Sequence, residues 1–155
     1  MLSINKSQVL ESQVDKAILI TADTVCSAGR TIMPKAGNDD DVRYCLQQMS
    51  GRRNTVYTGL TISKIIDYKI DTMKTILVTS IIKFKRLTYQ EIESYVDTKE
   101  GIGKAGGCSI TGRAQLFFSF ISGSYSNIVG LPLFELGKLL IASGYEVKEN
   151  IITDA

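Results

Sequence analysis

The sequence predicts an α/β fold, a single domain with helices flanking a mixed β-sheet. Two long β-branched segments, 56–62 and 75–84, have the composition of strands. Segments 38–51, 88–96 and 132–144 carry start and stop signals of helices and are interleaved with the strands. The chain has 155 residues, enough to bury one core. We therefore expect one domain over residues 1–155.

The first strand is predicted from an apolar run that ends in polar residues. Ile18–Ile20 leads into Ala22-Asp23-Thr24, which predicts a buried strand ending at a polar edge. Gly29-Arg30 is a turn before a short return through Ile32 and Met33. The mostly polar segment 63–74 predicts a hairpin with a loose tip between the long strands, and a further strand is expected at 116–121.

The helices are predicted from capping residues. Asn38 can cap a helix whose first turn is acidic at 39–41 and which Gly51 ends. Thr88 and Glu91 form a capping box. The last helix begins at Pro132 and closes at Gly144, directly after a polar, flexible loop.

Composition excludes several classes of function. The net charge of +2 gives no field that would mark a binder of nucleic-acid polymers or membranes, and no apolar run approaches about 20 residues. The absence of histidine excludes Ser-His-Asp and Cys-His mechanisms. Three widely spaced cysteines are typical of reduced thiols, so a cytoplasmic protein is expected.

A glycine-rich segment matches the dinucleotide fingerprint G-x-G-x-x-G at 101–106. It follows a predicted helix and precedes a predicted strand, which is the reverse of the order that a pyrophosphate site at a helix N-terminus requires. We therefore expect a loop whose amides and Lys104 approach an anion, not a Rossmann site.

Two charged residues are candidates for chemistry. Asp23, just past the end of an apolar strand, could bind a divalent metal or accept a proton from water, although its local sequence favours the capping of a turn. Lys35 could reach a phosphate or lie in solvent. The acidic run at 39–41 suits the helix dipole better than a metal.

Several motifs in combination resemble the Maf family of nucleoside triphosphate pyrophosphatases. The resemblance covers about residues 6–145 and is closest to the branch that hydrolyses dTTP, UTP and related or modified nucleotides. It rests on the following segments, in family order and at similar intervals: Ala22-Asp23-Thr24-Val25, 32–35, Leu46, Ser50-Gly51-Arg52, Val56-Tyr57-Thr58-Gly59, 84–87, Lys104-Ala105-Gly106-Gly107 and 123–133.

The resemblance implies an elongated sheet and a hydrolase with a divalent cofactor, Mg²⁺ or Mn²⁺. Such an enzyme cleaves the bond between the α and β phosphates and releases a monophosphate and pyrophosphate. Asp23 matches the family's proton acceptor and is the expected metal ligand. Lys35 and Lys6 match phosphate-binding lysines, while Thr111 and Lys104 are expected to line the pocket.

The sequence also departs from the family pattern. The family's first strand and its S-x-S-P-R-R loop have no match, so we expect an N-terminally truncated domain with an unpaired sheet edge, which favours a homodimer. Thr111 stands where the family has glutamine, Asn54 where histidine is usual, and Ala36 replaces a proline. An alternative interpretation is a catalytically inactive, truncated Maf-like protein that binds nucleotides or another protein.

Overall fold

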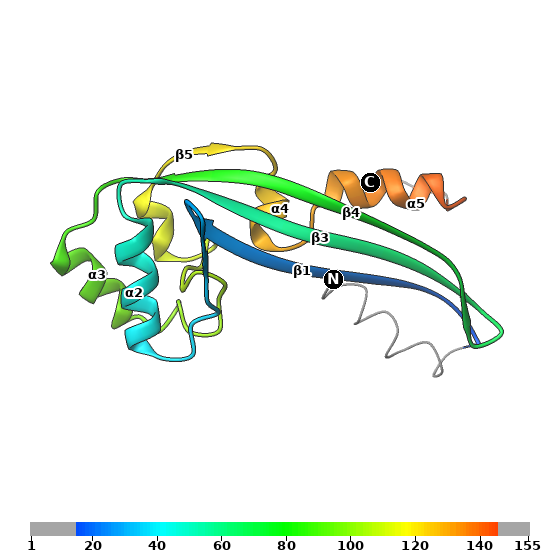
Figure 1. Cartoon of the computed structure of the whole chain (residues 1–155), viewed down its shortest axis with the longest axis horizontal. Helices are drawn as coiled ribbons and strands as arrows, with labels where there is room; N and C mark the ends of the chain where they lie inside the picture. Colours follow the sequence, from blue (N-terminus) through cyan, green and yellow to red (C-terminus); the bar gives the residue numbers. More distant parts are fainter. Residues whose placement is uncertain (1–14, 146–155) are drawn as a thin grey trace, which may run out of the picture.

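The computed structural model describes residues 15–145, which form one α/β domain with an elongated five-stranded sheet (Figure 1). The strand order is β2-β1-β3-β4-β5. The strands are β1 (Lys16–Ala28), β2 (Thr31–Met33), β3 (Arg53–Ile66), β4 (Lys69–Phe84) and β5 (Phe118–Ser122). Every pairing among these described strands is antiparallel, whereas the sequence predicted a mixed sheet. The α/β class, the elongated sheet and the flanking helices are confirmed.

The three long strands form a ribbon that extends well beyond the other helical segments, and one C-terminal helix runs alongside this extension (Figure 1). The prediction of a loose tip over 63–74 is wrong, because β3 and β4 remain paired as far as Ile66 and Lys69. Isoleucine recurs through this stretch and suits a pleated ladder. Only Asp67 and Tyr68 turn, with φ of 50° and 60°, as a two-residue hairpin requires.

Within residues 15–145, five helical segments accompany the sheet. They are α2 (Asp39–Met49), α3 (Tyr89–Val96), the 3₁₀ helix η2 (Arg113–Phe117), α4 (Tyr125–Val129) and α5 (Leu133–Ala142). The predicted caps are confirmed: Asn38 accepts from the Asp41 amide, and Thr88 and Glu91 form a reciprocal capping box. Arg43 of α2 joins Glu93 of α3 through two side-chain hydrogen bonds.

The chain differs from prediction on either side of β5. The segment before Pro132 was expected to be a flexible loop, but Ser124 caps the short helix α4 there by accepting from the Asn127 amide. The first residues of the strand predicted at 116–121 are the end of η2 instead. Polar residues that hydrogen-bond their own backbone account for the hidden α4, because they favour caps and loops equally in sequence.

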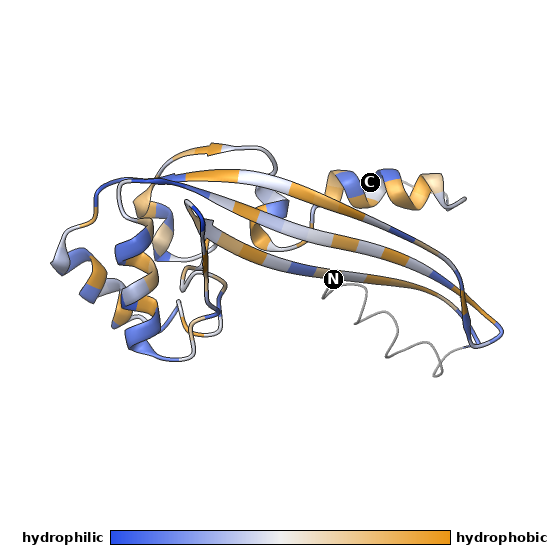
Figure 2. Ribbon diagram, in the orientation of Figure 1, coloured by the Kyte–Doolittle hydropathy of each residue, from blue (hydrophilic) through white to orange (hydrophobic). Residues whose placement is uncertain are grey.

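The buried side chains form two separate clusters. The larger one lies where α2, α3 and η2 pack against one end of the sheet, and we call this part of the molecule the head. The smaller one joins Leu136 of α5 to Leu60 and Ile62 of β3. Apolar and polar residues alternate along β3 and β4, so the two faces of each strand differ in hydropathy (Figure 2).

Within residues 15–145, none of the helices has the length and hydrophobicity needed to cross a membrane.

Candidate functional site

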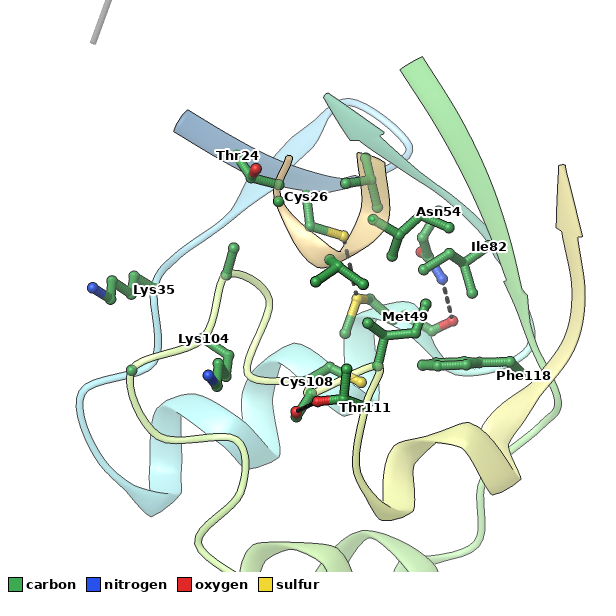
Figure 3. A pocket seen from close by; sticks show the side chains of 18 of the residues that line it. Thr24, Cys26, Lys35, Met49, Asn54, Ile82, Lys104, Cys108, Thr111 and Phe118 are labelled. Carbon is green, nitrogen blue, oxygen red and sulfur yellow. Dashed lines mark hydrogen bonds between the residues drawn. The ribbon is translucent and has the colours of Figure 1, made fainter. Parts of the chain in front are cut away.

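A pocket of about 340 Å³ lies between the sheet and the loops of the head (Figure 3). Residues from β1, β3, β4, β5, α2, α4 and two loops line it, so it depends on the complete arrangement of the head. Its described lining residues are Asp23, Thr24, Cys26, Lys35, Met49, Asn54, Val56, Ile82, Phe84, 103–105, 108–111, Phe118 and 128–130.

The sheet supplies the inner wall of this pocket. Cys26 pairs with Val56 across β1 and β3, and Asn54 pairs with Ile82 across β3 and β4. Asn54 and Val56 are two residues apart, so they share one face of the sheet. Met49, at the end of α2, completes this wall with its sulfur 3.7 Å from the sulfur of Cys26. The inner part of the pocket is therefore mostly apolar.

Two lysines lie at the pocket on two loop segments that are joined by backbone hydrogen bonds. Lys35 and Ala105 form an isolated antiparallel bridge. The Ala36 amide donates to the Lys104 carbonyl at 3.1 Å, and the Gly103 amide donates to the Ala36 carbonyl at 2.7 Å. These backbone bonds hold Lys35 and Lys104 on neighbouring segments, and both side chains are exposed at the pocket's outer side (Figure 3).

Gly106 allows the lysine-bearing loop to lie directly against β1. Its φ is +68°, and an added Cβ would lie 3.3 Å from the Cβ of Cys26. A larger residue would therefore meet both backbone strain and crowding. The Gly106 amide also donates to the Pro34 carbonyl, which adds to the backbone hydrogen bonds between the two loop segments.

A third wall comes from α4, which buried hydrogen bonds fix to the sheet. The Asn127 amide group donates to Ser80 Oγ at 2.9 Å, and Thr58 Oγ1 donates to the Asn127 carbonyl at 3.1 Å. Thr58 is also hydrogen-bonded to Thr24 at 2.9 Å. Residues 128–130 follow directly and line the pocket, so this network sets the position of that wall.

Thr111 lies at the exposed rim beside Ser109, with 3.3 Å between the two hydroxyl oxygens. The Ser109 amide donates to the buried Tyr95 hydroxyl at 2.9 Å, which ties the rim to α3. Burial raises the pKa of the neighbouring Cys108 thiol, so it stays neutral. The rim therefore offers hydroxyl groups to a ligand.

Four of the predicted site residues line this one pocket: Asp23, Lys35, Lys104 and Thr111. Lys6, the fifth, lies outside the described residues. Asp23 does not follow the end of a strand as predicted. It lies inside β1, opposite Gly59, because the ladder continues through Cys26 to Ala28. Among the described strands β2 pairs with β1 only at residues 26–28, so the edge of β1 at Asp23 borders the pocket.

Other charged motifs take structural roles. Asp39 is paired with Lys99, and Asp40 with Arg43, so the acidic run stabilises α2 and its surroundings as expected. The glycine-rich segment forms turns and not the start of a helix, and it brings Lys104 to the pocket.

Sequence reasoning missed the apolar inner wall, and it singled out Asn54 only as a departure from the family pattern. In the sequence, Val56, Ile82 and Phe84 cannot be distinguished from other strand residues. Which face of a strand lines a pocket depends on how other elements pack against the sheet. Asn54 gave a local signal, a polar residue beginning a β-branched strand, but its burial follows only from its pairing with β4.

Asp23 is the carboxylate among the described lining residues, and no cluster of three His, Cys, Asp or Glu suited to a metal occurs within 15–145. Mg²⁺ is typically held by one or two carboxylates together with water and substrate phosphates. One carboxylate beside two lysines thus fits a metal that arrives with a phosphate ligand.

The charged outer part and the apolar interior define an α/β protein with a pocket suited to a phosphate ester that carries a flat, less polar group. The family model described as "Maf-like protein" matches residues 1–143, so the chain belongs to this family. The chain is 48% identical over 145 residues to a protein from Orientia tsutsugamushi (strain Boryong) named nucleoside triphosphate pyrophosphatase. That alignment covers 94% of this chain and 71% of the relative.

Two further relatives carry the same name. The protein from Rickettsia akari (strain Hartford) is 49% identical over 147 residues, covering 94% of this chain and 73% of the relative. The protein from Rickettsia typhi (strain ATCC VR-144 / Wilmington) is 48% identical over 150 residues, covering 96% of this chain and 66% of the relative. These names do not favour the alternative of an inactive Maf-like protein.

Proposed function

We propose that this chain is a nucleoside triphosphate pyrophosphatase that hydrolyses the α–β phosphoanhydride of dTTP, UTP or related modified nucleotides. The products are a nucleoside monophosphate and pyrophosphate. The observation that carries the proposal is the convergence of Asp23, Lys35, Lys104 and Thr111 on one pocket. These residues come from segments far apart in the sequence, and the relatives' names support the general activity of a nucleoside triphosphate pyrophosphatase.

The residues divide the chemistry between them. Lys35 and Lys104 offset the negative charge of the triphosphate and hold it at the outer side of the pocket. Asp23 accepts a proton from the water that attacks the α phosphorus, so that the attacking oxygen becomes a better nucleophile. The pyrophosphate then leaves in line with the new bond.

A divalent cation, Mg²⁺ or Mn²⁺, belongs to this proposal. Asp23 would hold it, and the cation would neutralise charge on the phosphates. Thr111 would contact the base or a phosphate through its hydroxyl group. The resemblance adds Lys6 as a phosphate ligand. A homodimer, a cytoplasmic location and a single domain over 1–155 stay predictions.

The decisive experiment follows pyrophosphate release from dTTP, UTP, CTP and modified nucleotides with Mg²⁺ or Mn²⁺, using the protein and its Asp23→Asn variant. We expect kcat to fall by two or more orders of magnitude in Asp23→Asn, since the amide cannot accept the proton. The thermal melting temperature, measured in parallel, should change little.

Asp40→Asn is the matched control. Asp40 is also a carboxylate, but it lies on α2, is almost fully exposed and does not line the pocket. Its kcat should equal that of the unchanged protein. Equal turnover in Asp23→Asn and Asp40→Asn would exclude Asp23 as the base, and a folded protein without turnover on any nucleotide would refute the proposed activity.

A further inference from the structure

We propose that Asn54 is a specificity-determining residue that accepts a hydrogen bond from a ring N–H of the nucleotide base. Uracil and thymine present such a donor, whereas cytosine presents an unprotonated nitrogen at the same place. The inference rests on the proposed function and extends it by naming the atom that would distinguish these bases.

The position of Asn54 is the first support. Asn54 lies on the inner wall of the pocket, across from Lys35 and Lys104 (Figure 3). Its side chain is fully buried, with 0% exposure, among the apolar residues of β3 and β4. A polar side chain in such a place has a large energetic effect on whatever enters.

The orientation of the Asn54 amide group is fixed. Nδ2 donates to the Met49 carbonyl at 3.0 Å and to the Arg52 carbonyl at 3.3 Å. Rotating the amide group by 180° would place Oδ1 against these carbonyl oxygens, so the observed orientation is the favoured one. Both Nδ2 hydrogens are thereby used, and Oδ1 is left as an acceptor.

No donor among residues 15–145 reaches Asn54 Oδ1. Leaving a buried acceptor without a donor changes an equilibrium constant by about tenfold to a hundredfold. A ligand that supplies an N–H recovers this free energy, and one that supplies a second acceptor loses more. Asn54 can therefore discriminate between ligands of nearly equal shape.

The distribution of charge directs the base toward Asn54. Both lysines lie at the outer part of the pocket, where the triphosphate would be held (Figure 3). The inner part is lined by Met49, Val56 and Ile82, which suit a planar base. A nucleotide bound in the opposite sense would bury its phosphates among apolar groups without counter-charges.

A bound base requires a small local movement. Oδ1 of Asn54 is closed to solvent, so a neighbouring side chain must shift before a ligand atom touches it. Met49 lines the same pocket and has an unbranched, flexible thioether side chain that can make this shift.

The test compares ligands first. With the unchanged protein, kcat/KM for UTP should exceed that for CTP and for N3-methyl-UTP by about tenfold or more. Equilibrium binding of the α,β-methylene analogues of UTP and CTP should show the same preference. The binding measurement separates recognition from hydrolysis, so failure of the proposed reaction can be distinguished from failure of this inference.

The test then compares variants. Asn54→Leu has a branched apolar side chain of the same length, and we expect the UTP:CTP ratio to fall about tenfold, toward one. Ser63→Ala is the control, because Ser63 is equally buried in β3 and its Oγ also has no hydrogen-bond partner among the described residues, but it does not line the pocket. That variant should keep the ratio even if it loses stability.

Each outcome decides the question. A ratio that falls in Asn54→Leu and persists in Ser63→Ala supports the inference. If Asn54→Leu does not fold, the comparison of UTP with N3-methyl-UTP in the unchanged protein decides alone. Equal use and equal binding of UTP, CTP and N3-methyl-UTP would overturn the inference while leaving the pyrophosphatase proposal intact.

Discussion

Burial makes the cysteines of the head weak acids. Desolvation raises the pKa of Cys26 to about 12 and that of Cys45 to about 11. All three cysteines carry free thiols, in agreement with the sequence prediction. Because a thiolate is the reactive form, these thiols contribute packing and not nucleophilic chemistry at neutral pH.

The raised pKa values predict a loss of stability at high pH. The folded-state pKa of Cys26 and Cys45 lies above the ordinary value of 9.0, so their contribution is complete below about pH 9 and is lost as the pH rises toward 11–12. Urea unfolding at pH 8 and pH 10 should show a decrease on the order of 1 kcal/mol per thiol. Cys45→Ala should lose less between these pH values, and an identical pH dependence in this variant would contradict the assignment.

At the scale of residues, the sequence predicted charged groups better than buried ones. Asp23, Lys35 and Lys104 stand in recognisable motifs whose chemistry is local. Asn54 stood out only as a departure from the family pattern. Its free acceptor could not be predicted, because it depends on which carbonyls Nδ2 reaches after β3 and α2 have packed. A polar residue reveals such a role only through its three-dimensional partners.

At the scale of elements, α4 is positioned by one buried hydroxyl group. Ser80 Oγ accepts from the Ser124 amide at 3.1 Å and from Asn127 Nδ2 at 2.9 Å, and it lies 3.2 Å from the Ser124 carbonyl. Gly123 is packed tightly against the same serine, since an added Cβ would lie 2.7 Å from Ser80 Oγ. The short helix therefore depends on β4 for its place beside the pocket.

We expect Ser80→Ala to lower the free energy of unfolding by about 1–3 kcal/mol, because it leaves the Asn127 amide group without its close partner. KM should rise as well, since residues 128–130 line the pocket. Urea unfolding and steady-state kinetics check both effects. Ser119→Ala removes an exposed hydroxyl group from β5 and should change stability by less than about 0.5 kcal/mol. Equal effects of the two variants would rule out this role for Ser80.

Elements with strong local signals were predicted and those that depend on tertiary contacts were not. The helix after Asn38 and the one after Thr88 are confirmed, because their caps are set within four residues. The short helix α4 was missed, because five residues cannot hold a helix without packing. The length of the β3–β4 hairpin was underestimated, because polar residues on one face of a strand resemble a loop in sequence.

At the scale of the whole molecule, the site and the far end of the ribbon belong to different cores. We call the far parts of the long strands, 16–22, 60–66 and 69–76, the arm (Figure 1). Among residues 15–145, the head buries many side chains in one cluster, whereas the cluster that joins the arm to α5 is smaller. Units with fewer buried contacts open at lower free energy, so the arm is expected to open before the head unfolds.

This order of opening predicts an asymmetric response of amide hydrogen exchange to two core substitutions. Leu46→Ala removes a fully buried side chain from the head and should lower the free energy of exchange there by about 2–5 kcal/mol. Amides of the arm should keep their rates, because opening of the arm leaves the contacts of Leu46 intact. Leu136→Ala removes contacts that exist only while the arm is closed. It therefore lowers the free energy both of opening the arm and of unfolding the head, and exchange should accelerate in both. Native-state exchange followed by mass spectrometry resolves both regions, with Phe134→Ala, an exposed residue of α5, as the control. If Leu46→Ala accelerates exchange in the arm as much as in the head, the molecule unfolds as one unit and the pocket shares its stability with the whole ribbon.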